Sequence, residues 1–231
     1  MPTASKRVSR KELREPDKFL IVTGKALEFV RRRKIPIALA VGLLVLAALG
    51  GLAFNAYKDR QNALAAPHFE RALERYHAGN YKEALSALEK VKDFRWSRYA
   101  ALAYLYEANT YVATGELDKA LTAAQRFLAA APADSLYRQI ALITLADVES
   151  LKGMSREAVG HYAEAEKIPG PLREQALIGK ARNYARAGDP KAAIAAYRQL
   201  LGENPPPDIS TRIELEIARL ESQPGTPPQT P

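Results

Sequence analysis

Cysteine is absent from the 231 residues of this chain, and histidine occurs three times. The lack of cysteine excludes a disulfide scaffold, a cysteine nucleophile, an iron–sulfur centre, a zinc site with thiolate ligands and a lipid anchor on an N-terminal cysteine. It leaves the compartment open, because a chain without thiols suits oxidising and reducing surroundings alike. Hydrophobic residues make up 47% and charged residues 26% of the sequence, which is the balance of a folded protein.

The motifs of common catalytic and metal sites are also missing. His68, His77 and His161 show no H-E-x-x-H or similar metal-ligand spacing. There is no G-x-S-x-G motif, and Gly24-Lys25 lacks the upstream glycine and the following Ser or Thr of a phosphate-binding loop. The carboxylates are interspersed with Lys and Arg, as on solvated helix faces. We therefore predict that the chain is not an enzyme and uses no metal and no cofactor.

Charge is distributed unevenly along the chain. Residues 1–34 carry eleven Lys and Arg against four Asp and Glu, a net charge of +7, and residues 35–57 carry none. Residues 58–231 carry 23 basic and 22 acidic side chains, a net charge of +1. The formal charge of +8 is thus concentrated at one end, and the balanced main body predicts no nucleic-acid partner. We also expect no small-molecule substrate.

Residues 35–54 form an uninterrupted apolar segment without an ionisable side chain. As a helix with a rise of about 1.5 Å per residue, this segment would be about 30 Å long, which matches the hydrocarbon core of a bilayer. We predict a single transmembrane helix over residues 35–57. A cleaved signal peptide is the alternative, but its apolar stretch is roughly 7–15 residues after a short basic region, whereas 34 residues precede this one. A buried helix of a soluble protein is a third interpretation.

The orientation of the span follows from the basic residues Arg31, Arg32, Arg33 and Lys34, which directly precede it. Clustered positive charge remains on the cytoplasmic side of a membrane. On the other side, Lys58, Asp59 and Arg60 nearly cancel. We expect the N-terminus in the cytoplasm and the main body outside it.

The basic segment 1–34 contains apolar residues at helical spacing over residues 16–33. This pattern predicts an amphipathic helix, which would either lie on anionic lipid or act as a solvated tether whose arginines set only the topology. At the other end, residues 222–231 are rich in proline and polar residues, and we expect them to be disordered.

A pattern of about 36 residues repeats four times after the apolar segment. Gly79, Gly115, Gly153 and Gly188 lie 36, 38 and 35 residues apart. An alanine stands seven residues before and five residues after each glycine; these are Ala72 and Ala84, Ala108 and Ala120, Ala146 and Ala158, and Ala181 and Ala193. Small residues at these places predict two helices that cross closely, with a left-handed glycine ending the first helix. Such helix pairs bury their faces only by stacking.

These residues resemble the tetratricopeptide repeat, whose small–glycine–alanine–proline skeleton they match over roughly residues 66–205. The spacings exceed the usual 34 residues, and Pro190 stands where an aromatic residue is usual. The resemblance implies an all-α fold, with a transmembrane helix followed by an α-solenoid of about four helix pairs over residues 58–221. Residues 208–221 fit a capping helix with Ile209, Ile213, Ile217 and Leu220 as its apolar stripe and Asp208 or Ser210 as its N-cap.

Alignment of the repeats predicts which residues of each first helix line a concave groove. These positions are Phe69, Leu73, Tyr76, Leu102, Leu105, Asn109, Ile140, Ile143, Asp147, Ile178 and Arg182. Each single position is also compatible with the core. Together they predict an apolar groove with a few polar groups, which suits an apolar or extended peptide. The Lys and Asn of the family's carboxylate clamp are replaced by Phe69 and Leu73, which disfavours the acidic tails of cytosolic chaperones as ligands.

The layout of a basic segment, one span and about four repeats resembles the YfgM-like family of bacterial inner-membrane proteins, ancillary subunits of the Sec translocon. This resemblance implies a periplasmic repeat domain that contacts the translocon and periplasmic chaperones and assists newly exported chains. A structural scaffold in a secretion, pilus or cell-division machine is the alternative, and a secreted enzyme is a further one that the missing site motifs disfavour.

Overall fold

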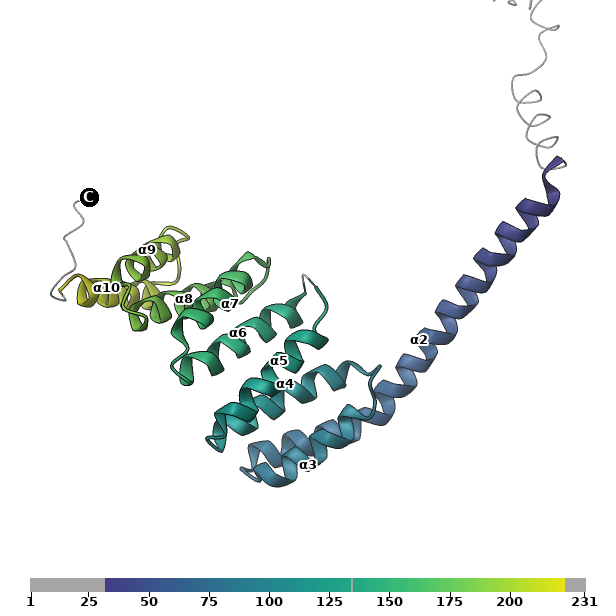
Figure 1. Cartoon of the computed structure of the whole chain (residues 1–231), viewed down its shortest axis with the longest axis horizontal. Coiled ribbons are helices and arrows are strands. Elements are labelled where there is room, and N and C mark those ends of the chain that lie inside the picture. Colours follow the sequence, from purple (N-terminus) through teal and green to yellow (C-terminus); the bar gives the residue numbers. More distant parts are fainter. Residues whose placement is uncertain (1–31, 134, 223–231) are drawn as a thin grey trace, which may run out of the picture. The chain divides into compact units, whose positions relative to one another are not determined.

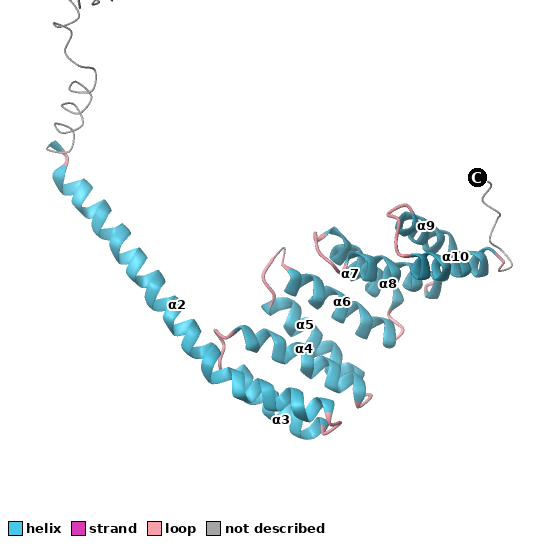
Figure 2. Ribbon diagram, turned by 180° about the vertical axis from the view of Figure 1, so that it is seen from behind, coloured by secondary structure: helices cyan, strands magenta, loops and turns pink. Residues whose placement is uncertain are grey.

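The structure is a computed structural model that describes residues 32–133 and 135–222 (Figure 1). Most of the predicted amphipathic helix, Arg31 and residues 223–231 of the predicted disordered tail lie outside these ranges. The chain divides into two compact units, Met1–Tyr57 and Lys58–Pro231. Within the described ranges the regular elements are all helices, without a strand (Figure 2), so the predicted all-α fold class is confirmed.

The described part of the first unit contains the beginning of helix α2 (Lys34–His77). An 18-residue window of this helix has a mean hydropathy of 2.6, and none of the window is buried. Leu39, Leu43 and Leu44 are each at least 65% exposed. A continuous apolar surface of this length is unfavourable in water. By length and composition, α2 is therefore a candidate membrane span.

The second unit is a stack of antiparallel helix pairs in sequence order (Figure 1). The end of α2 pairs with α3 (Tyr81–Lys92), and α4 (Arg98–Ala113) pairs with α5 (Leu117–Ala130). The next pairs are α6 (Leu136–Leu151) with α7 (Ser155–Lys167), and α8 (Arg173–Arg186) with α9 (Pro190–Leu201). Helix α10 (Pro207–Glu221) packs on the last pair. The predicted four pairs and capping helix are thus present.

All four turns within the pairs have the same geometry. Each connection has three residues, and its central glycine has a φ of 75° to 81°. The residue after each glycine donates its N–H to the carbonyl five residues earlier, as Asn80 does to Arg75 at 2.9 Å and Glu116 does to Tyr111 at 2.8 Å. This is the Schellman motif, which requires a left-handed residue at that place. The prediction of left-handed glycines that end each first helix is confirmed.

The paired alanines lie where the helices cross. All eight are at most 1% exposed. Consecutive pairs are always joined by five residues, whereas the two helices between successive glycines have 12 and 16, 14 and 16, and 13 and 14 residues. The unequal spacing of the glycines therefore arises from helix length rather than from the connections.

The predicted N-cap of the last helix is wrong. Helix α10 begins at Pro207, and Pro206 occupies the N-cap without a side-chain hydrogen bond. Proline is favoured at the first helical position because its φ is already helical and its missing N–H has no partner there. The Ser210 hydroxyl instead donates to the carbonyl of Pro205 at 3.1 Å. The predicted apolar stripe does face the core, where Ile213, Ile217 and Leu220 are buried.

Candidate functional site

The residues predicted to line the groove fall into three groups in the structure. Phe69 and Ile143 are 6% and 3% exposed and belong to the core. Leu73, Tyr76, Leu102, Leu105, Asn109 and Ile140 are half-buried. Asp147, Ile178 and Arg182 line one cavity of about 470 Å³. The structure thus brings three of the eleven predicted residues together in an open site.

Aromatic rings fill the N-terminal end of the predicted groove. The Phe69 ring lies 5.1 Å from the Tyr99 ring and 5.6 Å from the Tyr106 ring, measured between centroids. The Tyr76 ring lies 5.6 Å from the Tyr106 ring and 6.0 Å from the Tyr81 ring. These contacts explain why Phe69 is buried: the tyrosines of α4 cover it. In the middle, Leu105 and Ile140 both pack on a cluster around Phe127, which is fully buried.

The cavity in the C-terminal half, here called the groove pocket, is lined by α6, α7, α8 and α10. Its lining residues are Asp147, Ser150, Leu151, Tyr162, Glu174, Gln175, Ile178, Gly179, Arg182, Asn183, Arg186 and Arg212. Three arginines stand against two carboxylates. Arg182 and Arg212 are exposed, and Arg186 donates to the Ser150 hydroxyl. The groove pocket therefore combines three arginines with apolar residues such as Leu151 and Ile178.

A hydrogen bond joins Tyr162 and Asp147 in the wall of the groove pocket. The Tyr162 hydroxyl donates to the Asp147 carboxylate. Burial raises the pKa of Asp147, against the lowering effects of this hydrogen bond and of the Arg182 charge. Burial also raises the pKa of Tyr162, and its bond to Asp147 raises it further. Tyr162 thus stays a neutral donor and holds Asp147 in place at the wall of the pocket.

Gly179 makes room for the Tyr162 ring. A Cβ at Gly179 would lie 2.3 Å from Cε1 of Tyr162, which is shorter than any normal contact. Glycine therefore lets the ring, which is 3% exposed, lie against the backbone of α8. Beside it, the Asn183 side chain donates to the Gly179 carbonyl at 2.9 Å. Its own Oδ1 is buried and has no hydrogen-bond partner within residues 32–133 and 135–222.

Sequence reasoning missed nine of the twelve residues that line the groove pocket, among them Tyr162, Gly179, Arg186 and Arg212. Arg186 lies four residues after Arg182, so helical spacing places both on one face of α8. Arg212 lies on α10, outside the repeat alignment. Tyr162 occupies a place that the repeat pattern assigns to the core, and no local signal identifies Gly179.

Near the pocket, His161 of α7 bonds to a buried carboxylate of α6. Its Nδ1 lies 2.7 Å from Oε2 of Glu149, which is 4% exposed. This hydrogen bond raises the pKa of His161; burial opposes the shift, and the charges of Glu149 and Glu164 add to it. When it is protonated, the imidazole offsets the negative charge of this buried carboxylate.

We expect stability to depend on pH through His161. Because its folded pKa lies above the unfolded value of about 6.5, its contribution is complete below that value and is lost as the pH rises through the folded pKa. The variant His161→Gln keeps a donor but does not titrate. Thermal melting of the full chain in mild detergent, at pH values from about 6 to about 8, should show wild type losing stability relative to His161→Gln. Parallel pH profiles would contradict this assignment.

Residues that could hold a metal ion are not gathered in the described ranges: among them there is no group of three or more His, Asp or Glu side chains. The chemistry that the groove pocket offers is recognition. Three guanidinium groups can form bidentate hydrogen bonds with carboxylates.

Two family models match the chain. One, described as a tetratricopeptide repeat-like domain, covers residues 29–168, and another, described as a tetratricopeptide repeat, covers residues 175–206. No curated protein sequence matches.

Similar folds occur among solved structures. A Podosopora anserina putative kinesin light chain with nearly identical TPR-like repeats has a TM-score of 0.58 and 19% identity, covering 70% of this chain and 86% of its own. The MamA protein has a TM-score of 0.55 and 16% identity, covering 68% and 80%. YrrB, a TPR protein with an unusual peptide-binding site, has a TM-score of 0.53 and 17% identity, covering 74% and 86%. At these identities the likeness shows the fold.

Proposed function

Because this chain belongs to the tetratricopeptide repeat-like family, whose stacked repeats are protein-binding modules, we propose that it is a membrane-anchored protein-binding module of the bacterial cell envelope. Its repeat domain would be periplasmic and would assist translocon-linked export or periplasmic folding. The partners would be Sec translocon subunits, periplasmic chaperones or newly exported chains, as the YfgM-like layout implies. Catalysis has no part in this proposal.

The groove pocket is the observation that carries the binding role. It is an open cavity on the first helices of the last two pairs, and it is lined by Arg182, Arg186 and Arg212. Arginine forms charge-assisted, bidentate bonds with carboxylates. We therefore infer that the groove binds a protein segment bearing acidic residues. The half-buried Leu105 and Ile140 would contact apolar residues of the same segment further along the groove. YrrB, which shares the fold, has a peptide-binding site.

The anchor is supported by two observations. None of the residues that the structure describes buries the most apolar window of α2, and a hydrocarbon environment would remove this surface from water. The family match begins at residue 29 and so includes the apolar segment together with the first repeats. The basic residues before the span favour an N-terminus in the cytoplasm.

Affinity purification from gently solubilised membranes tests the groove. We expect the double variant Arg182→Glu and Arg212→Glu to recover partners at least about tenfold less than wild type, because two arginine–carboxylate contacts at about 1.5–3 kcal/mol each are lost. Both side chains are exposed, and circular dichroism melts of the variant establish that a loss of recovery does not reflect unfolding. A matched control is Arg156→Glu with Lys191→Glu, which changes the net charge equally on exposed residues outside the pocket.

The outcomes separate the candidate functions. Recovery of translocon subunits and many exported chains, lost in the groove variant alone, supports the proposal. One stoichiometric complex would instead indicate a scaffold subunit of an envelope machine. Equal recovery with both double variants would show that the groove pocket is not the binding site.

The proposed orientation has its own test. Protease added to spheroplasts should degrade the repeat domain, and full protection of that domain would contradict the proposed orientation.

A further inference from the structure

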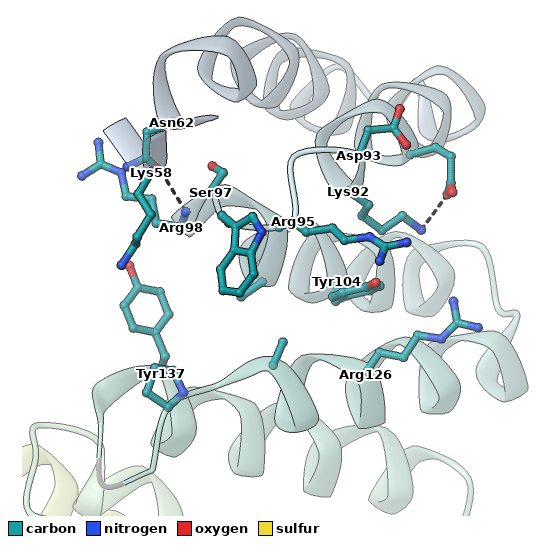
Figure 3. Close-up of a pocket in the computed structure, with 16 residues that line it drawn as sticks. Lys58, Asn62, Lys92, Asp93, Arg95, Ser97, Arg98, Tyr104, Arg126 and Tyr137 are labelled. Carbon is teal, nitrogen blue, oxygen red and sulfur yellow. Dashed lines mark hydrogen bonds and ion pairs between the residues drawn. The ribbon is translucent and has the colours of Figure 1, made fainter. Parts of the chain in front are cut away.

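A second and larger cavity lies at the start of the repeat domain, where α2, α3, α4, α5 and α6 contribute residues. Its volume is about 980 Å³, and we call it the proximal pocket. Its charged and aromatic lining residues are Lys58, Glu89, Lys92, Asp93, Arg95, Trp96, Arg98, Tyr104, Arg126 and Tyr137. Five cations stand against two carboxylates. In Figure 3, Arg95, Tyr104 and Arg126 converge at one end of the pocket, and Lys58 and Tyr137 lie at the other.

The cations differ in how far they are neutralised. Lys92 is paired with Glu89 at 2.6 Å and with Glu107 at 3.0 Å, so its charge is offset within the protein. Arg95 is exposed. Arg98 is also exposed, and its guanidinium lies over the Tyr99 ring and donates to the Tyr99 hydroxyl at 3.1 Å, an interaction that leaves its charge in place. The mouth of the pocket therefore has a positive potential.

The segment between α3 and α4 holds one aromatic ring inside the protein and one outside. Phe94 packs on the core cluster that contains Phe69 and Leu88, and its ring stacks on His68 with a centroid distance of 5.9 Å. Ser97 is 5% exposed and caps α4 by accepting a hydrogen bond from the N–H of Tyr99. Between them, Trp96 is 54% exposed. A tryptophan held in this way beside arginines is typical of the interface between membrane and water, where its amphipathic ring is favoured.

Chain length alone places this pocket close to the end of the apolar segment. Lys58 directly follows Tyr57, and neighbouring Cα atoms are about 3.8 Å apart. Asn62 is four residues further, about 6 Å along a helix, and its side chain accepts a hydrogen bond from the Arg98 N–H at 2.9 Å. The polar headgroup layer of a bilayer is about 5–8 Å thick on each side. The pocket therefore lies within reach of the headgroups wherever the segment leaves the membrane.

We propose that the proximal pocket binds the headgroups of anionic phospholipids in the leaflet where the span ends. This inference rests on the proposed membrane anchor. Lys58, Arg95 and Arg98 contact the phosphates, and Trp96 enters the interface. The pocket thereby holds the start of the repeat domain against the membrane surface. This contact adds to the covalent connection between the apolar segment and the repeat domain.

Trp96 reports on its own position because the chain has one tryptophan. The full chain is reconstituted into vesicles of phosphatidylcholine alone or mixed with phosphatidylglycerol, and flotation establishes that it is inserted. We expect the Trp96 emission to shift to shorter wavelength and to be quenched by lipids brominated near the headgroup, more strongly with phosphatidylglycerol. The variant Arg95→Glu with Arg98→Glu should lose the dependence on phosphatidylglycerol. The control Arg156→Glu with Lys191→Glu should retain it.

Several results would overturn the proposal. An inserted protein whose Trp96 emission is the same in detergent and in both vesicles has no headgroup contact. Equal quenching in both vesicle types rules out recognition of anionic lipid. An equal shift caused by glycerol phosphate in detergent would identify a free phosphate ligand instead. A chain that fails to float with the vesicles overturns the anchor and this proposal together. Circular dichroism melts of the variants show whether a lost response reflects unfolding.

Discussion

Replacing Gly179 with alanine is expected to lower the free energy of unfolding by about 1–3 kcal/mol, the usual cost of overpacking a well-packed site. The new Cβ would lie 2.3 Å from Cε1 and 2.4 Å from Cζ of Tyr162. The ring is buried and its hydroxyl is bonded to Asp147, so it cannot move aside without giving up both its packing and that bond. The change therefore also distorts the groove pocket.

Gly160 provides a matched control with the opposite sign. It lies in the middle of α7, is exposed, and a Cβ there would meet nothing within 4 Å. Alanine should stabilise the protein by about 0.8–1 kcal/mol at that position, because glycine is a poor helix former. Melting temperatures of the two single variants should thus move in opposite directions. If both variants melted above wild type, the close approach of Tyr162 to α8 would be disproved.

The second large effect is expected from leucine at Ala146. This alanine is fully buried and packs with Leu142, Ala158 and Tyr162 where α6 crosses α7. A leucine would force the helices apart and cost about 1–3 kcal/mol, which corresponds to roughly 2–4 °C in melting temperature per kcal/mol for a chain of this size. Ala108 occupies the equivalent place in the preceding pair and should respond in the same way.

Ala133 is the control for this series, because it is exposed in the connection between α5 and α6. Leucine there should leave the melting temperature unchanged. Equal melting temperatures for the leucine variants of Ala108, Ala146 and Ala133 would show that the repeat register is wrong. Both comparisons can be made on the full chain in mild detergent, with circular dichroism as the measure of melting.

The features that sequence reasoning predicted are those that a short stretch of chain determines. A left-handed turn needs glycine at one position, and the requirement is visible without knowledge of the neighbours. Closely crossing helices need small residues at two positions a fixed distance apart, and repetition identified both. The helix pairs, their turns and the alanine contacts at Ala108 and Ala146 therefore followed from spacing.

The features that it missed depend on partners far apart in the chain. Gln139 is fully buried, and its amide donates to the carbonyls of Ala165 and Ile168 at the end of α7. Nothing in the residues around Gln139 indicates this. The same holds for Gly179, whose role is defined by a ring seventeen residues earlier.

The exposure of the predicted groove residues also depends on partners far apart in the chain. Alignment placed Phe69 and Ile143 on the face that also bears Asp147 and Arg182. Which positions on the face stay open depends on the size of neighbouring side chains. Tyr99 and Tyr106 cover Phe69, whereas the residues around Asp147 leave a cavity.

Because the four glycine turns share one length and one geometry, the helix pairs are structurally equivalent units. Each turn has three residues with a left-handed glycine in the centre, and each junction between pairs has five residues. A segment cut from one glycine to the next therefore carries a whole structural unit with matching ends. Duplication or loss of such a segment would change the length of the groove by one step without creating a new loop, so related chains could differ in reach while every joint stays the same.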